Sequence, residues 1–201
     1  MTTTVTLNAS VDKLYLVKSL STGSITRVQK VYNSAGGKGI NVSRVASLAG
    51  EKVHAMGFLG GFSGEYIRLM LLQQGIEAEF TEIEAETRSC INVRDLSTGK
   101  HTELLEPGAP ITEKDLERFL KQYEAILPKS DVVTISGSSP VGTPINFYKK
   151  LVLLAKRAGK PVLLDTSGEM LAKGIQALPT MIKPNKEELS QLLGVSIHSR
   201  D

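Results

Sequence analysis

Three glycines stand within four residues in Gly36-Gly-Lys-Gly39, and a segment with helical spacing of its apolar residues follows directly. Glycine permits positive φ and a close approach between backbone and ligand. The first turn of the following helix would offer free N–H groups to an anion or a hydroxyl, and Lys38 adds a positive charge. The loop therefore suits either an ordinary strand-to-helix turn or a site for a phosphorylated or hydroxylated ligand. It is not a Walker P-loop, because the GxxxxGK[ST] spacing is absent.

Two polar residues near this loop could share its ligand. Asp12 follows a short apolar run and a polar turn, so we expect its carboxylate at the carboxyl edge of a strand, where it could accept two hydroxyls. Asn41 lies just beyond the glycine loop and could both donate and accept. Each has a structural alternative, because Asp after a turn commonly caps the backbone and Asn in a first helical turn bonds it.

Arg88 and Ser138 are candidates for contact with a phosphate. Arg88 opens an alternating segment, and its guanidinium fork fits phosphate; an exposed strand arginine, paired with a carboxylate such as Glu86, is the alternative. Ser138 lies in Ser136-Gly-Ser-Ser-Pro140, directly after the apolar run 131–135. Small residues there suit a phosphate or sugar contact, and equally any tight turn.

The segment Lys183-Pro-Asn-Lys-Glu-Glu188 has a structural and a functional interpretation. Asn185 is the predicted N-cap of a helix, and acidic residues favour the first turn that follows. This capping role explains the motif by itself. The functional interpretation places Asn185 and Glu188 beside the phosphates of a nucleotide and its Mg²⁺, which prefers hard oxygen ligands.

Strand and helix patterns alternate through most of the chain, which predicts an α/β fold with a mostly parallel sheet covered by helices. The expected strands are 5–7, 54–59, 131–135, 162–164 and 181–183. The expected helices are 41–49, 64–75, 113–127, 145–158 and 186–193. Two segments, about 12–34 and 78–106, carry short alternating runs instead. We expect them to form a small β-sheet lid of antiparallel strands over the site.

Composition excludes several other classes. The 201 residues are 41% hydrophobic and 22% charged with a net charge of +3, which is ordinary for a globular domain. Lysine and arginine are scattered along the sequence, so nucleic-acid binding is not expected. Cys90 is the only cysteine, and His54, His101 and His198 lack metal-ligand spacing, so no disulfide or zinc site is expected. No leader or membrane-length apolar run is present, and we expect a cytoplasmic protein that does not bind membranes.

Segment 34–50, SAGGKGINVSRVASLAG, resembles the first signature of the PfkB carbohydrate kinases, the ribokinase-like group. Further similar segments stand in the family's order: TLNASVD (6–12), GFLGGFSGEY (57–66), ETRSCINV (86–93), ISGSSP (135–140), LLDTSGE (163–169) and IKPNKEEL (182–189). Within the family, the chain is most similar to the 1-phosphofructokinase and tagatose-6-phosphate kinase types. Ala9 stands where proline is common and Ser139 where leucine is common, and neither change removes a functional group.

The resemblance implies a sugar-phosphate kinase that uses ATP and Mg²⁺. Because exposed lid faces often pair between subunits, we also expect a homodimer joined through the lid. Its acceptor would be a ketohexose monophosphate, either fructose 1-phosphate or tagatose 6-phosphate. The residues implied to hold sugar hydroxyls are Asp12, Gly37 and Asn41. Those implied to grip the existing phosphate are Lys38, Arg88 and Ser138. The nucleotide side would comprise Asp165, Lys183, Asn185 and Glu188, with Glu188 toward the metal.

One family motif is missing from the 201 residues. The family's GAGD-like sequence supplies an anion hole and an aspartate that deprotonates the acceptor hydroxyl, and no Gly-x-Gly-Asp occurs in this chain. The resemblance therefore implies that the catalytic aspartate lies beyond residue 201 and that residues 1–201 are inactive alone. The alternative is a non-catalytic protein that binds a sugar phosphate or regulates through it. A nicotinamide dehydrogenase is disfavoured, because the GxGxxG fingerprint is absent.

Overall fold

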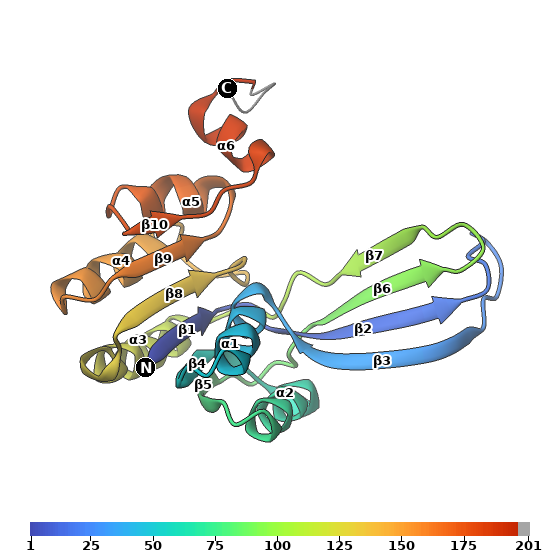
Figure 1. The fold of residues 1–201 in the computed structure, drawn as a ribbon, viewed down its shortest axis with the longest axis horizontal. Coiled ribbons are helices and arrows are strands. Elements are labelled where there is room, and N and C mark those ends of the chain that lie inside the picture. Colours follow the sequence, from blue (N-terminus) through green and yellow to red (C-terminus); the bar gives the residue numbers. More distant parts are fainter. Residues whose placement is uncertain (197–201) are drawn as a thin grey trace.

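The computed structural model describes residues 1–196, so His198 lies outside the described residues. The chain forms an α/β body from which a second, smaller sheet projects (Figure 1). Both parts are expected from the sequence, and the way they are joined determines the candidate site. Among the described residues, no helix is long and apolar enough to cross a lipid bilayer.

The body contains a six-stranded sheet in the order β10-β9-β8-β1-β4-β5. Its strands are β1 (Thr2–Thr6), β4 (Val53–Leu59), β5 (Glu77–Glu82), β8 (Val132–Ser136), β9 (Val162–Asp165) and β10 (Met181–Ile182). Every neighbouring pair is parallel, which confirms the expected sheet. Because all six strands run the same way, their carboxyl ends meet at one edge, where ligands of open α/β sheets bind.

Helices cover both faces of this sheet (Figure 1). They are α1 (Lys38–Leu48), α2 (Gly61–Gln73), α3 (Glu113–Ile126), α4 (Phe147–Arg157), α5 (Gly168–Ile175) and α6 (Lys186–Leu193), with a 3₁₀ turn η1 (Leu127–Lys129) after α3. The central strand β1 shows why two cores form. Val5 points into the core shared with α3 and α4, whereas the Thr4 hydroxyl bonds that of Ser43 in α1 at 2.6 Å on the other face.

The projecting sheet, here called the lid, has the strand order β3-β2-β6-β7. It consists of β2 (Ser10–Val17), β3 (Val28–Gly36), β6 (Ser89–Asp95) and β7 (His101–Leu105). Strand β2 pairs antiparallel with β3 but parallel with β6, so the lid is a mixed sheet rather than the antiparallel one expected. Mixed pairing arises because β2 and β6 both leave the body, whereas β3 and β7 both return to it.

The expected lid segment 78–106 is wrong in its first part. Glu77–Glu82 form β5, which pairs in parallel with β4 at the edge of the body sheet, and the lid resumes only at Ser89. Phe80 of β5 is buried in the core beneath α1 and α2. Short alternating runs look the same in an edge strand of a body sheet and in a lid strand, because both have one buried or half-buried face.

The chain crosses between body and lid four times. The crossings are residues 7–9, 37, 83–88 and 106–112, which we call the lid root. All four lie beside the carboxyl ends of β1 and β4 and the N-terminus of α1, so the lid root and the ligand-binding edge of the sheet are the same place (Figure 1).

Candidate active site

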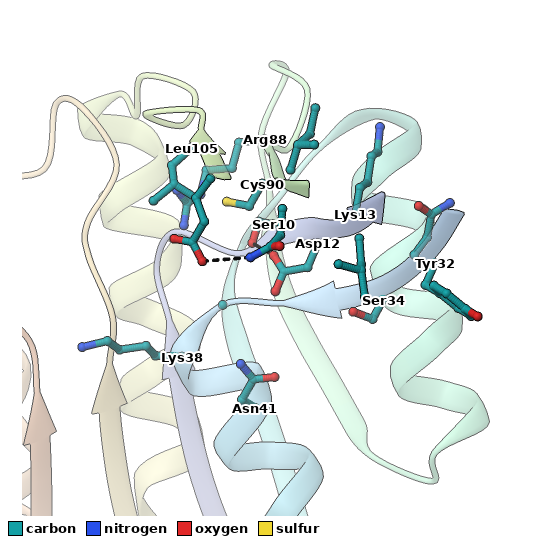
Figure 2. A pocket seen from close by; sticks show the side chains of 16 residues that line it. Ser10, Asp12, Lys13, Tyr32, Ser34, Lys38, Asn41, Arg88, Cys90 and Leu105 are labelled. Carbon is teal, nitrogen blue, oxygen red and sulfur yellow. Dashed lines mark hydrogen bonds between the residues drawn. The ribbon is translucent and has the colours of Figure 1, made fainter. Parts of the chain in front are cut away.

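A cavity of about 500 Å³ opens where the lid meets the N-terminus of α1 (Figure 2). The register of the lid explains its lining, because residues paired across strands project from the same face. Asp12 pairs with Ser34 on one side and Cys90 on the other, and Cys90 pairs with Leu105. The next row outward comprises Tyr32, Leu14, Asn92 and Glu103.

Asp12 has its carboxylate fixed at the base of this cavity. The hydroxyl of Ser10 donates to Asp12 Oδ1 at 2.7 Å. The carboxylate lies over Gly36, where a Cβ atom would stand 2.1 Å from the Asp12 carboxyl carbon. Gly36 is therefore needed to make room for Asp12 rather than for an unusual φ. Asp12 thus lies beside the glycine loop, within lid strand β2 rather than at the carboxyl edge of a body strand, where we expected it.

The glycine loop forms the wall opposite the lid. Gly37 has φ 106 and occupies the N-cap of α1, and no side chain within residues 1–196 caps that helix. Gly39 in the first turn packs so closely on β1 that a Cβ there would stand 2.2 Å from Thr6 Oγ1. Asn41, also in the first turn, is exposed and lines the cavity (Figure 2). The helix N-terminus is thus held rigidly against the sheet and faces the cavity.

Arg88 lines the cavity from the lid root. Its Nη1 donates to the Glu106 carbonyl at 2.8 Å and its Nη2 to the Asn8 carbonyl at 3.1 Å, while its buried Nε has no partner among the described residues. Glu86, the carboxylate considered as its partner, instead accepts from the backbone N–H groups of Phe62 and Ser63 at the start of α2. Arg88 is therefore a fixed cation held by carbonyl oxygens, and no acid within residues 1–196 pairs with it.

Ser138 does not line the cavity, but Asn8 connects it to Arg88, which does. The Asn8 side-chain amide donates to the Ser138 hydroxyl at 3.1 Å, and the Asn8 main-chain carbonyl accepts from Arg88. The Tyr148 hydroxyl donates to the carbonyls of Gly137 and Ser138 and holds this loop from below. Burial raises the pKa of Tyr148, so its hydroxyl keeps its proton at physiological pH. Ser138 itself is exposed.

Lys38 connects the cavity to the nucleotide side expected from the sequence. It lines the cavity, but its side chain extends away from Asp12 (Figure 2). Its Nζ lies 3.3 Å from Asp165 Oδ1, and Nζ of Lys183 lies 3.4 Å from Asp165 Oδ2. Asp165 is 16% exposed and the two lysines are at least half exposed. Two mobile ammonium groups therefore converge on one carboxylate at the carboxyl ends of β9 and β10.

Asn185 and Glu188 form a capping box at the start of α6. Asn185 Oδ1 accepts from the Glu188 N–H at 2.8 Å, and Glu188 Oε2 accepts from the Asn185 N–H at 2.8 Å. The predicted N-cap is confirmed. No group of three His, Cys, Asp or Glu residues among residues 1–196 could hold a metal ion by itself. Any Mg²⁺ here would depend on oxygens from its ligand.

Sequence reasoning missed the outer wall of the cavity and the residue at its root. The missed residues are Asn8, Ser10, Ser34, Cys90, Asn92, Glu103 and Leu105. Their alternation with outward-facing neighbours is visible in the sequence, but which residues face each other depends on the pairing register of four strands. That register was not available from the alternation alone.

Residues 3–201 match the family described as pfkB family carbohydrate kinase. The chain belongs to this family. Solved structures with the same fold agree with this assignment. A possible 1-phosphofructokinase from Thermotoga maritima is 32% identical to the chain, with a TM-score of 0.91. A putative phosphofructokinase from Staphylococcus aureus is 31% identical, with a TM-score of 0.82. Phosphofructokinase-2 from Escherichia coli, solved in complex with fructose-6-phosphate, is 26% identical with a TM-score of 0.93.

Each of these matches covers all of the PfkB chain described here, but only part of the relative. The share of the relative is 65% for the Thermotoga protein, 64% for the Staphylococcus protein and 66% for the Escherichia protein. The PfkB chain thus spans less than two thirds of each of these three relatives. The resemblance and the ribokinase-like α/β fold expected from the sequence are confirmed.

Proposed function

We propose that this PfkB protein transfers the terminal phosphoryl group of MgATP to a hydroxyl of a ketohexose monophosphate. The observation that carries the proposal is a single cavity that holds a fixed carboxylate, Asp12, and a fixed cation, Arg88, beside the N-terminus of α1. A carboxylate accepts hydrogen bonds from vicinal hydroxyls, and a guanidinium binds a phosphate dianion. Fructose 1-phosphate and tagatose 6-phosphate both carry these two features, as does the fructose 6-phosphate bound by the Escherichia relative.

Within this proposal the sugar lies between the lid and the glycine loop. Asp12 and Asn41 bind its hydroxyls with the backbone of Gly37, and Arg88 binds its existing phosphate with the help of Ser138. Two of the five N–H bonds of Arg88 are used on carbonyls, so the guanidinium retains donors for an anion. Closing the lid onto the sugar would exclude water from the reacting groups.

Lys38 takes a different part from the one implied by the family resemblance. Its ammonium faces Asp165 and Lys183 rather than Arg88. We therefore place Lys38 and Lys183 on either side of the phosphoryl group in transit, with Asp165 holding them in place before the nucleotide binds. Phosphoryl transfer depends on positioning and on neutralising the charge of the transferred group, which two ammonium groups supply.

The nucleotide and its metal belong to the edge formed by β9, β10 and α6. Mg²⁺ commonly keeps waters and phosphate oxygens as most of its ligands and takes only one or two carboxylates from a protein. A single carboxylate, Glu188, fits that requirement. Its Oε2 is used in the helix cap, and its other oxygen remains available to the metal. The metal would neutralise nucleotide phosphates. The general base and anion hole implied by the family resemblance are not among residues 1–201.

We further propose that two copies associate through the lid. Both lid faces carry apolar side chains that are more than half exposed, including Val31 and Tyr32 on β3 and Leu104 and Leu105 on β7. A sheet with apolar groups on both faces is stabilised by a covering surface, and a second copy of the lid offers a matching one.

The experiment that tests the kinase proposal is a coupled ADP-release assay on the complete gene product. It compares fructose 1-phosphate, tagatose 6-phosphate and fructose 6-phosphate with the unphosphorylated ketoses. Arg88→Ala should weaken ketose phosphate binding by about 2 kcal/mol, or about thirtyfold, through loss of a charged hydrogen bond, and should leave ATP affinity unchanged. Asp12→Asn should impair phosphorylated and unphosphorylated ketoses alike. Lys38→Met should lower kcat more than it raises the KM for the sugar.

The matched control for Arg88 is Arg94, an exposed arginine on strand β6, which begins directly after Arg88. Arg94→Ala should leave the KM for the ketose phosphate unchanged. An Arg88→Ala enzyme with a raised KM for ATP and normal sugar binding would show that the two ends of the site are assigned the wrong way round. Failure of all three sugar phosphates to bind would overturn the substrate class.

A further inference from the structure

Asn8 occupies a junction that the proposed reaction does not use directly. It lies in the first crossing of the lid root and is 8% exposed. Its side-chain nitrogen donates to the Pro107 carbonyl at 3.1 Å and to the Ser138 hydroxyl at 3.1 Å. Its main-chain carbonyl accepts from Arg88 Nη2 at 3.1 Å. One residue thus joins the first, third and last crossings of the lid root to the loop after β8.

The orientation of the Asn8 amide follows from its partners. The Pro107 carbonyl can only accept, so the amide nitrogen of Asn8, not its oxygen, must face it. The same nitrogen faces Ser138, so the Ser138 hydroxyl must act as the acceptor. A hydroxyl that accepts from Asn8 retains its own proton for another partner. Because Ser138 is exposed, that partner can be a ligand.

Gly108 makes this arrangement possible. It has φ +95, and a Cβ there would stand 2.3 Å from Asn8 Oδ1. Any side chain at residue 108 would displace the Asn8 amide from Pro107 and Ser138. The last crossing of the lid root therefore accepts a hydrogen bond from Asn8 at Pro107 and leaves space for its amide at Gly108.

We propose that Asn8 is a positioning residue with two roles. It makes the Ser138 hydroxyl an acceptor toward Asn8, so that its proton is donated to the phosphate of the bound sugar. It also holds Arg88 and the lid root in place beside Ser138. Its main-chain carbonyl holds the Arg88 guanidinium, and its side chain holds Ser138 and Pro107. The phosphate part of this inference rests on the proposed function, whereas the tie between Asn8 and the lid root does not.

Two measurements on the complete gene product test the inference. The first is binding of whichever ketose monophosphate the unmodified protein binds most tightly, with its unphosphorylated parent ketose and ATP as comparisons. Asn8→Ala should weaken ketose phosphate binding about tenfold, as expected for one lost hydrogen bond to a charged ligand, and leave the other two unchanged. Ser138→Ala should give a similar loss, and the double variant should be no weaker than Ser138→Ala, because both changes remove one donor.

The second measurement is hydrogen exchange without any ligand. Asn8→Ala should speed exchange of the amides in residues 105–110, and Gly108→Ala should do the same by displacing Asn8. Asn146→Ala, which removes an exposed asparagine side chain that does not cap α4, should change neither exchange nor binding.

The outcomes separate the two proposals. Independent effects of Asn8→Ala and Ser138→Ala, or equal losses for phosphorylated and unphosphorylated ketoses, would overturn the positioning role. Unchanged exchange in residues 105–110 would overturn the tie to the lid root. If the unmodified protein binds no ketose monophosphate while exchange responds as expected, the tie stands and the assignment of the Ser138 proton to a sugar phosphate is refuted together with the proposed substrate.

Discussion

The body and the lid of this PfkB protein are held together by different forces. In the body, all seven residues of β4 are buried, and the sheet is covered by helices on both faces. In the lid, all five residues of β7 are exposed, and seven of the nine residues of β3 are exposed as well. Apolar burial stabilises the body, whereas hydrogen bonds at the root and the outer end fix the geometry of the lid.

The candidate site lies where these two regions meet, and this division suits its task. The body presents the α1 N-terminus and the Asp165 carboxylate, while the lid carries Asp12 and the lid root carries Arg88. A ligand that contacts both regions would add the apolar and charged contacts that the lid lacks in its own fold. Changes in the body should therefore alter unfolding, and changes in the lid should alter binding or assembly.

The largest contrast is expected between Phe119→Ala and Leu104→Ala. Phe119 is fully buried, and its ring lies 5.2 Å from that of Phe58 and 6.0 Å from those of Tyr123 and Phe147. Its loss should destabilise the protein by about 3–5 kcal/mol in urea unfolding. Leu104 is 58% exposed on β7, so Leu104→Ala should leave the unfolding free energy within about 0.5 kcal/mol.

The same pair tests the proposed association through the lid. Leu104→Ala should shift the sedimentation of the complete gene product toward the single subunit, whereas Phe119→Ala under folding conditions should not. A Leu104→Ala protein with reduced stability and unchanged sedimentation would contradict the division between the two regions.

An intermediate effect is expected from Gly36→Ala at the end of β3, next to the lid root. The added methyl group would stand 2.1–2.2 Å from the Asp12 carboxyl atoms and must push that carboxylate out of place. Sugar binding should weaken by about 1.5–3 kcal/mol, the range for a hydrogen bond to a charged group, as measured by titration calorimetry. Gly23→Ala is the control for the binding assay, because it strains the backbone (φ +74) at a lid turn that does not line the cavity. Normal sugar binding by Gly36→Ala would remove Asp12 from the site.

The smallest effect is expected at Asp95 in the outer part of the lid. Its carboxylate accepts from the Ser97 hydroxyl at 2.7 Å and from the N–H groups of Leu20, Ser97 and Thr98. These bonds, led by the Ser97 hydroxyl, lower the pKa of Asp95 to about 2. Because the folded pKa lies below the usual value of 3.8, the carboxylate stabilises the lid above that value and loses its effect as the pH falls toward about 2.

A ¹³C NMR titration of the Asp95 carboxyl group should give a midpoint near the value of about 2. Ser97→Ala should raise that midpoint, since it removes the leading hydrogen bond, and Asp95→Asn should speed amide exchange near Leu20 and Thr98 at neutral pH. A midpoint at the ordinary value for aspartate would show that these bonds do not fix the outer lid.

The extent to which the sequence predicts this structure differs between the same two regions. Helix α3 was predicted from its N-cap at Thr112, and α6 from Asn185, because capping chemistry is local in sequence. The parallel body sheet follows from alternation of strand and helix. Helix α5 was missed, because its eight residues provide barely two turns of periodicity.

The candidate site was predictable only where one residue type has a strong chemical meaning. Asp12 follows an apolar run and a polar turn, Lys38 lies within the glycine loop, and Arg88 opens an alternating segment; all three charged side chains line one cavity. The direction of the Lys38 side chain depends on Asp165, which lies 127 positions away in the sequence. Asn8 gives no local signal at all, because its partners belong to three segments that only the tertiary fold brings together.

The four crossings of the lid root restrict how the lid can travel. A domain attached by two linkers can rotate and translate in several directions, whereas four short tethers restrict sliding and spinning and leave a hinge-like swing. The position of the lid is then described by one angle. One pair of spectroscopic labels, with one at Lys18, directly after the outer end of β2, and the other at Lys150 on α4, should therefore report the whole trajectory as a single coordinate.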